Sequence, residues 1–106
     1  MTTVKLIRSK SGYVGFEVRG HTGWSINGDD ILCAAISSAV QLVANGITEC
    51  AGEKACVKTE EDTVRLRLKS ESSKESVQVL FEAFRLHMSL LAKQYEDNIS
   101  IEIVEV

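Results

Sequence analysis

An apolar stripe at helical spacing occupies the first half of the chain and limits the folds open to it. Its members are Leu32, Ile36, Val40, Val43 and Ile47. This spacing predicts an amphipathic helix over about Ile31–Glu49, with one face buried. Asp29 or Asp30 is its natural N-cap. Because Gly46 costs roughly 1 kcal/mol relative to Ala inside a helix, the alternative is that the helix ends near Gly46.

Segments of alternating apolar residues flank this stripe and predict strands. The expected strands are Val4–Arg8, Tyr13–Arg19, Ala55–Thr59 and Thr63–Leu68, with turns at Ser11-Gly12 and Glu60-Glu61-Asp62. A second helix follows from the stripe Val77, Leu80, Phe81, Phe84, Met88, Leu91 and Tyr95. Ser72 or Ser73 is its expected cap, Asp97-Asn98 ends it, and Ile99, Ile101 and Ile103 predict a last strand. The order β-β-α-β-β-α-β indicates an α+β two-layer sandwich, a largely antiparallel sheet with two helices on one face.

Length and charge narrow the possible roles of the chain. Its 106 residues suit one domain, residues 1–106. The formal net charge is -3, and proteins that grip nucleic acid through its phosphates usually carry a basic stripe. We therefore expect no direct nucleic-acid binding. We also expect no membrane association and no signal peptide, because no long apolar span stands out. A cytoplasmic protein is the expectation that follows.

The cysteines and histidines argue against disulfides and metals. Three cysteines are present, and no pair has the CxxC spacing. A disulfide framework or structural zinc site is therefore not expected, and the thiols should be reduced. Only two histidines occur, and neither has Cys or carboxylate partners at a recognised ligand spacing. We expect no metal and no other cofactor.

The unusual stretch runs from Gly20 to Ser37. A histidine, His21, stands at the end of a predicted strand, and Cys33 stands in the first turn of the predicted helix. A free thiol has a pKa near ~8.5, so little thiolate exists at neutral pH. A helix N-terminus favours the anion by roughly 0.3–1 kcal/mol, less than the ~1.4 kcal/mol of one pKa unit. A nearby imidazolium would supply the larger part and would protonate a leaving amine.

Plainer interpretations of the same residues remain open. A cysteine at a helix start is often a small core residue, and His21 in a loop can simply bind a backbone carbonyl. Asp30 either caps the helix or orients His21, and its charge would raise the pKa of the Cys33 thiol. Ser37 either supports the site or bonds back to a helix carbonyl.

Other residues have simple interpretations. Trp24 packs on the core or contacts a substrate. Cys50 and Cys56 are structural or incidental, His87 lies at the edge of the second helical stripe, and Arg65, Arg67 and Lys69 form the solvated face of a strand. The loop Gly20–Asp29 contains glycines that predict a mobile segment ordered by substrate.

A family resemblance rests on the same stretch. Gly20-His21, Gly28, Asp30-Ile31, Cys33-Ala34 and Ser37 together resemble the signature of the ribosomal-processing cysteine protease family Prp. The resemblance implies a catalytic Cys33 and His21, with Asp30, Ser37, Gly20 and Gly28 in supporting positions. It also implies a homodimer, and removal of a short N-terminal extension from a bacterial large-subunit ribosomal protein.

Two other functions compete with this one. A non-catalytic ribosome-associated binding module of the same fold needs neither His21 nor Cys33. A redox sensor could manage with Cys33 and a resolving thiol. Catalysis needs both residues, so replacement of His21 alone separates the three hypotheses.

Overall fold

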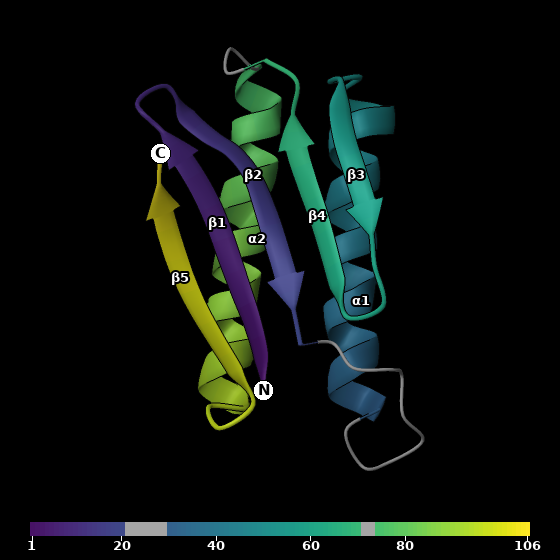
Figure 1. Ribbon diagram of the computed structural model, residues 1–106, viewed down its shortest axis with the longest axis vertical. Coiled ribbons are helices and arrows are strands. Elements are labelled where there is room, and N and C mark those ends of the chain that lie inside the picture. Colours follow the sequence, from purple (N-terminus) through teal and green to yellow (C-terminus); the bar gives the residue numbers. More distant parts are fainter. Residues whose placement is uncertain (21–29, 71–73) are drawn as a thin grey trace.

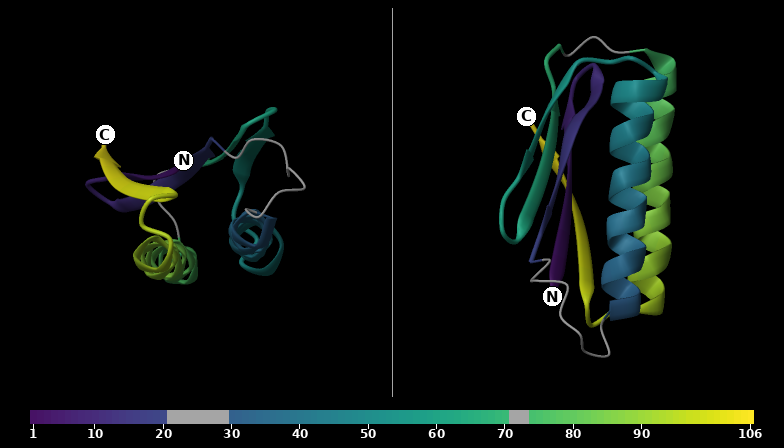
Figure 2. Two further views of the ribbon diagram at one scale, coloured as in Figure 1. Left: turned by 90° about the horizontal axis from the view of Figure 1, so that it is seen from below. Right: turned by 90° about the vertical axis from the view of Figure 1, so that its right-hand side faces the viewer.

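The computed structural model describes residues 1–20, 30–70 and 74–106, and the predicted α+β architecture is confirmed in it (Figure 1). The elements, in chain order, are β1 (Thr2–Ser9), β2 (Gly12–Arg19), α1 (Asp30–Asn45), η1 (Gly46–Cys50), β3 (Ala55–Thr59), β4 (Thr63–Leu68), α2 (Glu75–Gln94) and β5 (Ile99–Glu105). Both helices lie side by side on one face of the sheet, which gives two layers (Figure 2).

The sheet has the order β3-β4-β2-β1-β5. Both predicted hairpins are present, and β2 also pairs antiparallel with β4. β5 is the exception, because it pairs with β1 in parallel. The N-terminal and C-terminal strands are thus neighbours, and β3 and β5 form the two edges of a largely antiparallel sheet.

The core fills the space between the layers. Its fully buried side chains are Val4, Leu6, Phe16, Val18, Ile36, Ile47, Leu66, Val77, Phe81, Phe84 and Met88. Phe16 lies at the centre, with its ring centroid 4.7 Å from that of Phe84 and 6.4 Å from that of Phe81. Both predicted helical stripes therefore face the sheet, as expected for amphipathic helices.

The first helix changes character at Gly46. The α-helix ends at Asn45, and a π-helical turn continues it over Gly46–Cys50. Both alternatives for this glycine are thus partly right. The α-helical hydrogen bonding stops before Gly46, but the chain stays helical to Cys50. Such π-helical turns are rare and usually short.

We expected no segment apolar enough to cross a membrane, and the length and composition of one helix contradict this expectation. The segment Ile31–Cys50 has the length and apolar content of a membrane-crossing helix. Its apolar residues Leu32, Ile36, Val40, Val43 and Ile47 are buried in the core. Packing against the sheet accounts for part of this apolar character, because Ile31 and Leu42 of the same segment are exposed.

The expected helix caps also differ in part. α2 has Lys74 at its N-cap position, and no side chain caps it; Ser72 and Ser73 lie outside the described residues. Asp30 is the first helical residue of α1, and Asp29 lies outside the described residues. The side chain of Lys74 does not cap α2; its Nζ donates a hydrogen bond to the carbonyl oxygen of Ala51 at 2.5 Å.

The face of the sheet away from the helices is charged. One row of paired residues crosses all five strands: Lys58, Arg65, Glu17, Lys5 and Glu102. Arg65 Nε donates to Glu17 Oε2 at 3.1 Å, and Arg65 also pairs with Glu60 at 3.4 Å. The predicted solvated face is therefore a network of ion pairs.

Candidate active site

The structure places Cys33 in the first turn of α1, where its side chain is half-buried. Backbone N–H groups of the first helical turn have no partner within the helix, and they point toward the region before it. A thiolate or an oxyanion at this end of the helix is stabilised by the aligned peptide dipoles. Cys33 thus has the helix-start position that the sequence predicted.

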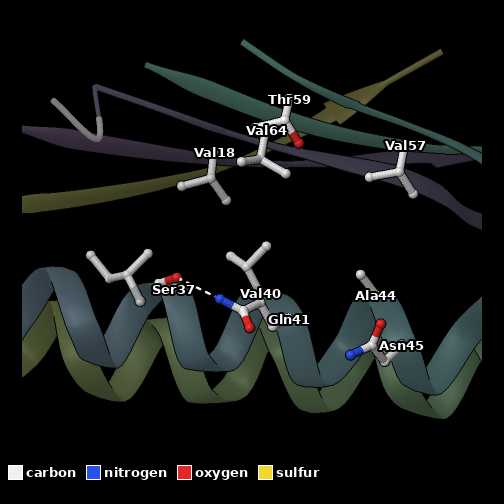
Figure 3. A pocket seen from close by; sticks show the side chains of 10 residues that line it. Val18, Ser37, Val40, Gln41, Ala44, Asn45, Val57, Thr59 and Val64 are labelled. Carbon is white, nitrogen blue, oxygen red and sulfur yellow. Dashed lines mark hydrogen bonds between the residues drawn. The ribbon is translucent and has the colours of Figure 1, made fainter. Parts of the chain in front are cut away.

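Ser37 lies one helical turn after Cys33 on the same face of α1. Its Oγ accepts a hydrogen bond from Gln41 Nε2 at 3.0 Å (Figure 3). The residue is therefore held by a side chain one further turn along the helix. Its role in catalysis stays a prediction.

Gly20 follows the last residue of β2 and precedes the predicted histidine. Its φ of +85° lies in the left-handed region, which side chains other than glycine rarely adopt. A Cβ at this position would overlap the carbonyl oxygen of Met1. The N–H of Gly20 also donates to the carbonyl oxygen of Asp62 at 3.0 Å. The end of β2 is thus fixed between the start of β1 and the β3–β4 turn.

This arrangement fixes Gly20, the last described residue before His21. The end of β2 lies at the same end of the molecule as the start of α1 (Figure 1). Met1 and Asp62 were not singled out from the sequence, because their contacts with Gly20 are long-range and no local pattern marks them.

The remaining members of the predicted site lie outside what the structure describes. These are His21, Gly28, Trp24 and the side chain of Asp30, together with the predicted mobile loop after Gly20. The dyad of His21 and Cys33 therefore remains a prediction.

The other candidates lie apart from this end of α1. Cys50 is exposed in η1, and Cys56 is exposed on the outer face of β3. His87 is exposed on α2 and lines a shallow apolar groove between the outer faces of the two helices, together with Leu42 and Ala83. Within residues 1–20, 31–70 and 74–106, no group of three or more His, Cys, Asp or Glu side chains is placed to hold a metal.

The titratable cluster with the clearest pKa shifts joins β2 to α2. Burial raises the pKa of Tyr13, and its hydroxyl donates to Glu82 Oε2 at 2.7 Å, which raises it further. The pKa of Glu82 is lowered, first by its hydrogen bond from Arg85 and then by that from Tyr13. Gln78 binds both the N–H and the carbonyl of Tyr13 at 2.8 Å. These contacts hold the helix on the sheet.

Comparison with known proteins points to one family. The family model described as cysteine protease Prp matches residues 1–100. The ribosomal processing cysteine protease Prp of Bacillus subtilis (strain 168) is 23% identical over 95 residues, which cover 85% of each chain.

Solved structures agree with this match in fold. The protein SMU.848 of Streptococcus mutans is 28% identical, with a TM-score of 0.88 over 100% of this chain and 99% of its own. The ribosomal processing protease Prp of S. aureus, in complex with a substrate peptide, is 17% identical. Its TM-score is 0.85 over 97% of this chain and 99% of its own.

Proposed function

The chain belongs to the cysteine protease Prp family, and on this premise we propose that it is an endopeptidase of ribosomal proteins. It removes a short N-terminal extension from a bacterial large-subunit ribosomal protein. The observation that carries the proposal is the position of Cys33 in the first turn of a helix of 16 residues, where a thiolate is stabilised.

The proposed chemistry is nucleophilic catalysis by a thiol. His21 takes the proton of the Cys33 thiol, and the thiolate sulfur attacks the scissile carbonyl carbon. Backbone N–H groups at the start of α1 bind the oxyanion that forms. The C–N bond then breaks, the imidazolium of His21 gives its proton to the leaving amine, and a thioester remains on Cys33. Water, deprotonated by His21, hydrolyses this thioester and restores the thiol.

The proposed supporting residues position the two catalytic residues. Gly20 fixes the end of β2 immediately before His21, through the contacts with Met1 and Asp62 described above. Gly28 supplies turn geometry in the connecting loop, Asp30 orients His21 or caps α1, and Ser37 supports the Cys33 turn. No cofactor or metal takes part in this scheme.

The proposed partners follow from surface chemistry. The net charge of -3 attracts a basic ribosomal protein at long range and repels RNA. A homodimer is proposed through the outer helix face, where Ile31, Leu42, Val79, Leu86 and Leu90 are exposed. Exposed apolar patches of this kind mark interaction sites. The protein acts in the cytoplasm, with no direct contact with nucleic acid or membrane.

The test uses the large-subunit ribosomal proteins of the same organism that carry N-terminal extensions, each with and without its extension. Mass spectrometry of the products locates any cut. The proposal predicts one cut in an extended form, none in the shortened form, and none with Cys33→Ala or His21→Ala, both of which should keep the native circular dichroism spectrum.

Three results would contradict parts of the proposal. Wild-type turnover by His21→Ala removes the general-base role. Free cleavage of unrelated unfolded proteins, with the extended ribosomal proteins left intact, leaves only the protease class. Absence of any cut, with reversible oxidation of Cys33 by peroxide to a disulfide, favours a redox sensor instead.

A further inference from the structure

An apolar groove separates α1 from the β3–β4 hairpin. It has a volume of about 270 Å³. The helix contributes Ile36, Val40 and Ala44, the sheet contributes Val18, Val57 and Val64, and the polar rim consists of Ser37, Gln41, Asn45 and Thr59 (Figure 3). None of these lining side chains is charged. The volume is just below the ~300–1,000 Å³ of pockets that hold small-molecule ligands, which suits a few side chains rather than a whole ligand.

The groove is open because β3 is an edge strand and α1 covers it incompletely. Val57 pairs in register with Leu66, which is fully buried, and so it points toward the helices. Its side chain is nevertheless 45% exposed. The hairpin tilts away from α1 toward its turn (Figure 2). An inward-pointing valine is thus left partly in water, where an incoming apolar group would cover it.

The groove starts at Ser37, one helical turn after the proposed nucleophile. Cys33, Ser37, Gln41 and Ala44 follow one another at spacings of four, four and three residues, so they lie on one face of α1. With a rise of ~1.5 Å per residue, Ser37 is about 6 Å and Ala44 about 16 Å along the helix from Cys33. An extended peptide advances ~3.3 Å per residue. The groove therefore runs alongside substrate residues about two to five positions from the scissile bond.

Charge beside the groove indicates what kind of segment fits it. The β3–β4 turn carries three consecutive carboxylates, Glu60, Glu61 and Asp62. Glu60 pairs with Arg65 at 3.4 Å, and all three residues are exposed to solvent. The carbonyl of Asp62 contacts Gly20, so this acidic turn lies next to the residue before His21. A basic peptide that enters the site meets a complementary charge there.

We infer that the groove between α1 and the β3–β4 hairpin is the specificity subsite of the enzyme. Its occupant is an extended, basic peptide segment that places an apolar side chain between Val57 and Ala44. By the spacing above, this side chain lies about five residues from the scissile bond. The inference rests on the proposed function for the identity of the peptide, but not for its binding.

The first test measures binding without cleavage. The Cys33→Ala variant is titrated with the extension peptide and with versions in which one apolar residue within five positions of the cut is changed to Ser. Methyl NMR signals of Val40, Val57 and Val64 should shift with the parent peptide. One Ser substitution should weaken binding by roughly 10-fold or more, because burial of an apolar side chain is lost. Shifts confined to methyl groups on the outer helix face, such as Leu42 and Leu86, would overturn the inference.

The second test uses a matched pair of edge-strand variants. Val57 on β3 and Ile103 on β5 both point toward the helix side of an edge strand, and they are 45% and 39% exposed. Val57→Asp should raise the KM for the extension peptide at least 10-fold, whereas Ile103→Asp should leave it within about twofold. Iodoacetamide should alkylate Cys33 in both variants at the wild-type rate, because neither substitution touches the nucleophile. Equal KM values in the two variants would overturn the inference.

The two tests separate this inference from the proposed function. If the peptide shifts the groove methyl signals but wild-type protein never cleaves it, peptide binding in the groove is supported and the proposed protease function is contradicted. If wild-type protein cleaves the peptide and every Ser-substituted version equally well, the protease proposal stands and the groove is not its subsite.

Discussion

Replacement of Gly20 tests whether the end of β2 is built to position His21. Ala at Gly20 or at Gly52 would have to adopt a positive φ, +85° and +69° respectively, at about 1–2 kcal/mol. Both substitutions also gain about 0.4–1 kcal/mol by restricting the unfolded chain. These two contributions are shared by both sites, so Gly52→Ala is the matched control.

The two sites differ in what a Cβ would meet. At Gly52 the nearest atom is Lys74 Nζ at 3.9 Å, whereas at Gly20 it is the carbonyl oxygen of Met1. A backbone carbonyl at a strand start cannot rotate away. Thr2 is held by a hydrogen bond from its N–H to the carbonyl of Asn98 at 2.8 Å. Relief of the overlap therefore costs at least one backbone hydrogen bond, about 1 kcal/mol net.

Gly20→Ala should thus be less stable than Gly52→Ala by about 1 kcal/mol or more. For a domain of this size the difference in Tm is roughly 4–8 °C per kcal/mol, measured by circular dichroism. Misplacement of His21 by about 1 Å should also lower kcat/KM by up to ~100-fold, while Gly52→Ala keeps wild-type activity. Equal Tm and equal activity in the two variants would refute the positioning role of Gly20.

Two further predictions concern the core and the Tyr13 cluster. Phe84→Ala removes a buried ring packed on Phe16 and should cost about 3–5 kcal/mol in urea unfolding. Val106→Ala, at an exposed position on another part of the surface, should change stability by less than about 0.5 kcal/mol. Similar losses in both variants would contradict the assigned core. Tyr13→Phe removes the hydrogen bond to Glu82 and should cost about 1 kcal/mol at neutral pH. Because the pKa of Tyr13 is raised in the folded state, its contribution is complete below pH 10 and is lost as pH rises through the folded value. Wild-type protein should therefore approach the stability of Tyr13→Phe in alkaline solution, and a constant difference up to the end of the titration would show that ionisation of Tyr13 is not linked to folding.

Local patterns predicted the elements of the fold well. The ranges Ala55–Thr59 and Thr63–Leu68 agree with β3 and β4, because clear alternation and an acidic turn define both ends. The parallel pairing of β5 with β1 could not be predicted from a local pattern. Alternation in Ile99–Ile103 identifies a strand, but the choice of neighbour depends on how α2 crosses the sheet. The start of α2 at Lys74, without a capping side chain, also had no local signal.

The candidate site was predictable to a similar degree. The helix-start position of Cys33 follows from apolar periodicity alone, and the structure agrees with it. The need for glycine at Gly20 depends on Met1 and Asp62, which are distant in sequence. The groove was not predicted either, since the alternation around Val57 indicates an inward-facing valine and says nothing of how far α1 covers it.

The most direct test of the account compares the reactivity of the three thiols. Cys33 is half-buried, whereas Cys50 and Cys56 are exposed, so access alone would make Cys33 the slowest to react with iodoacetamide. We predict that native protein near neutral pH is alkylated first at Cys33, as located by peptide mapping, and that His21→Ala removes this advantage. Labelling of Cys50 and Cys56 ahead of Cys33 in the wild-type protein would contradict the assignment of Cys33 as an activated nucleophile.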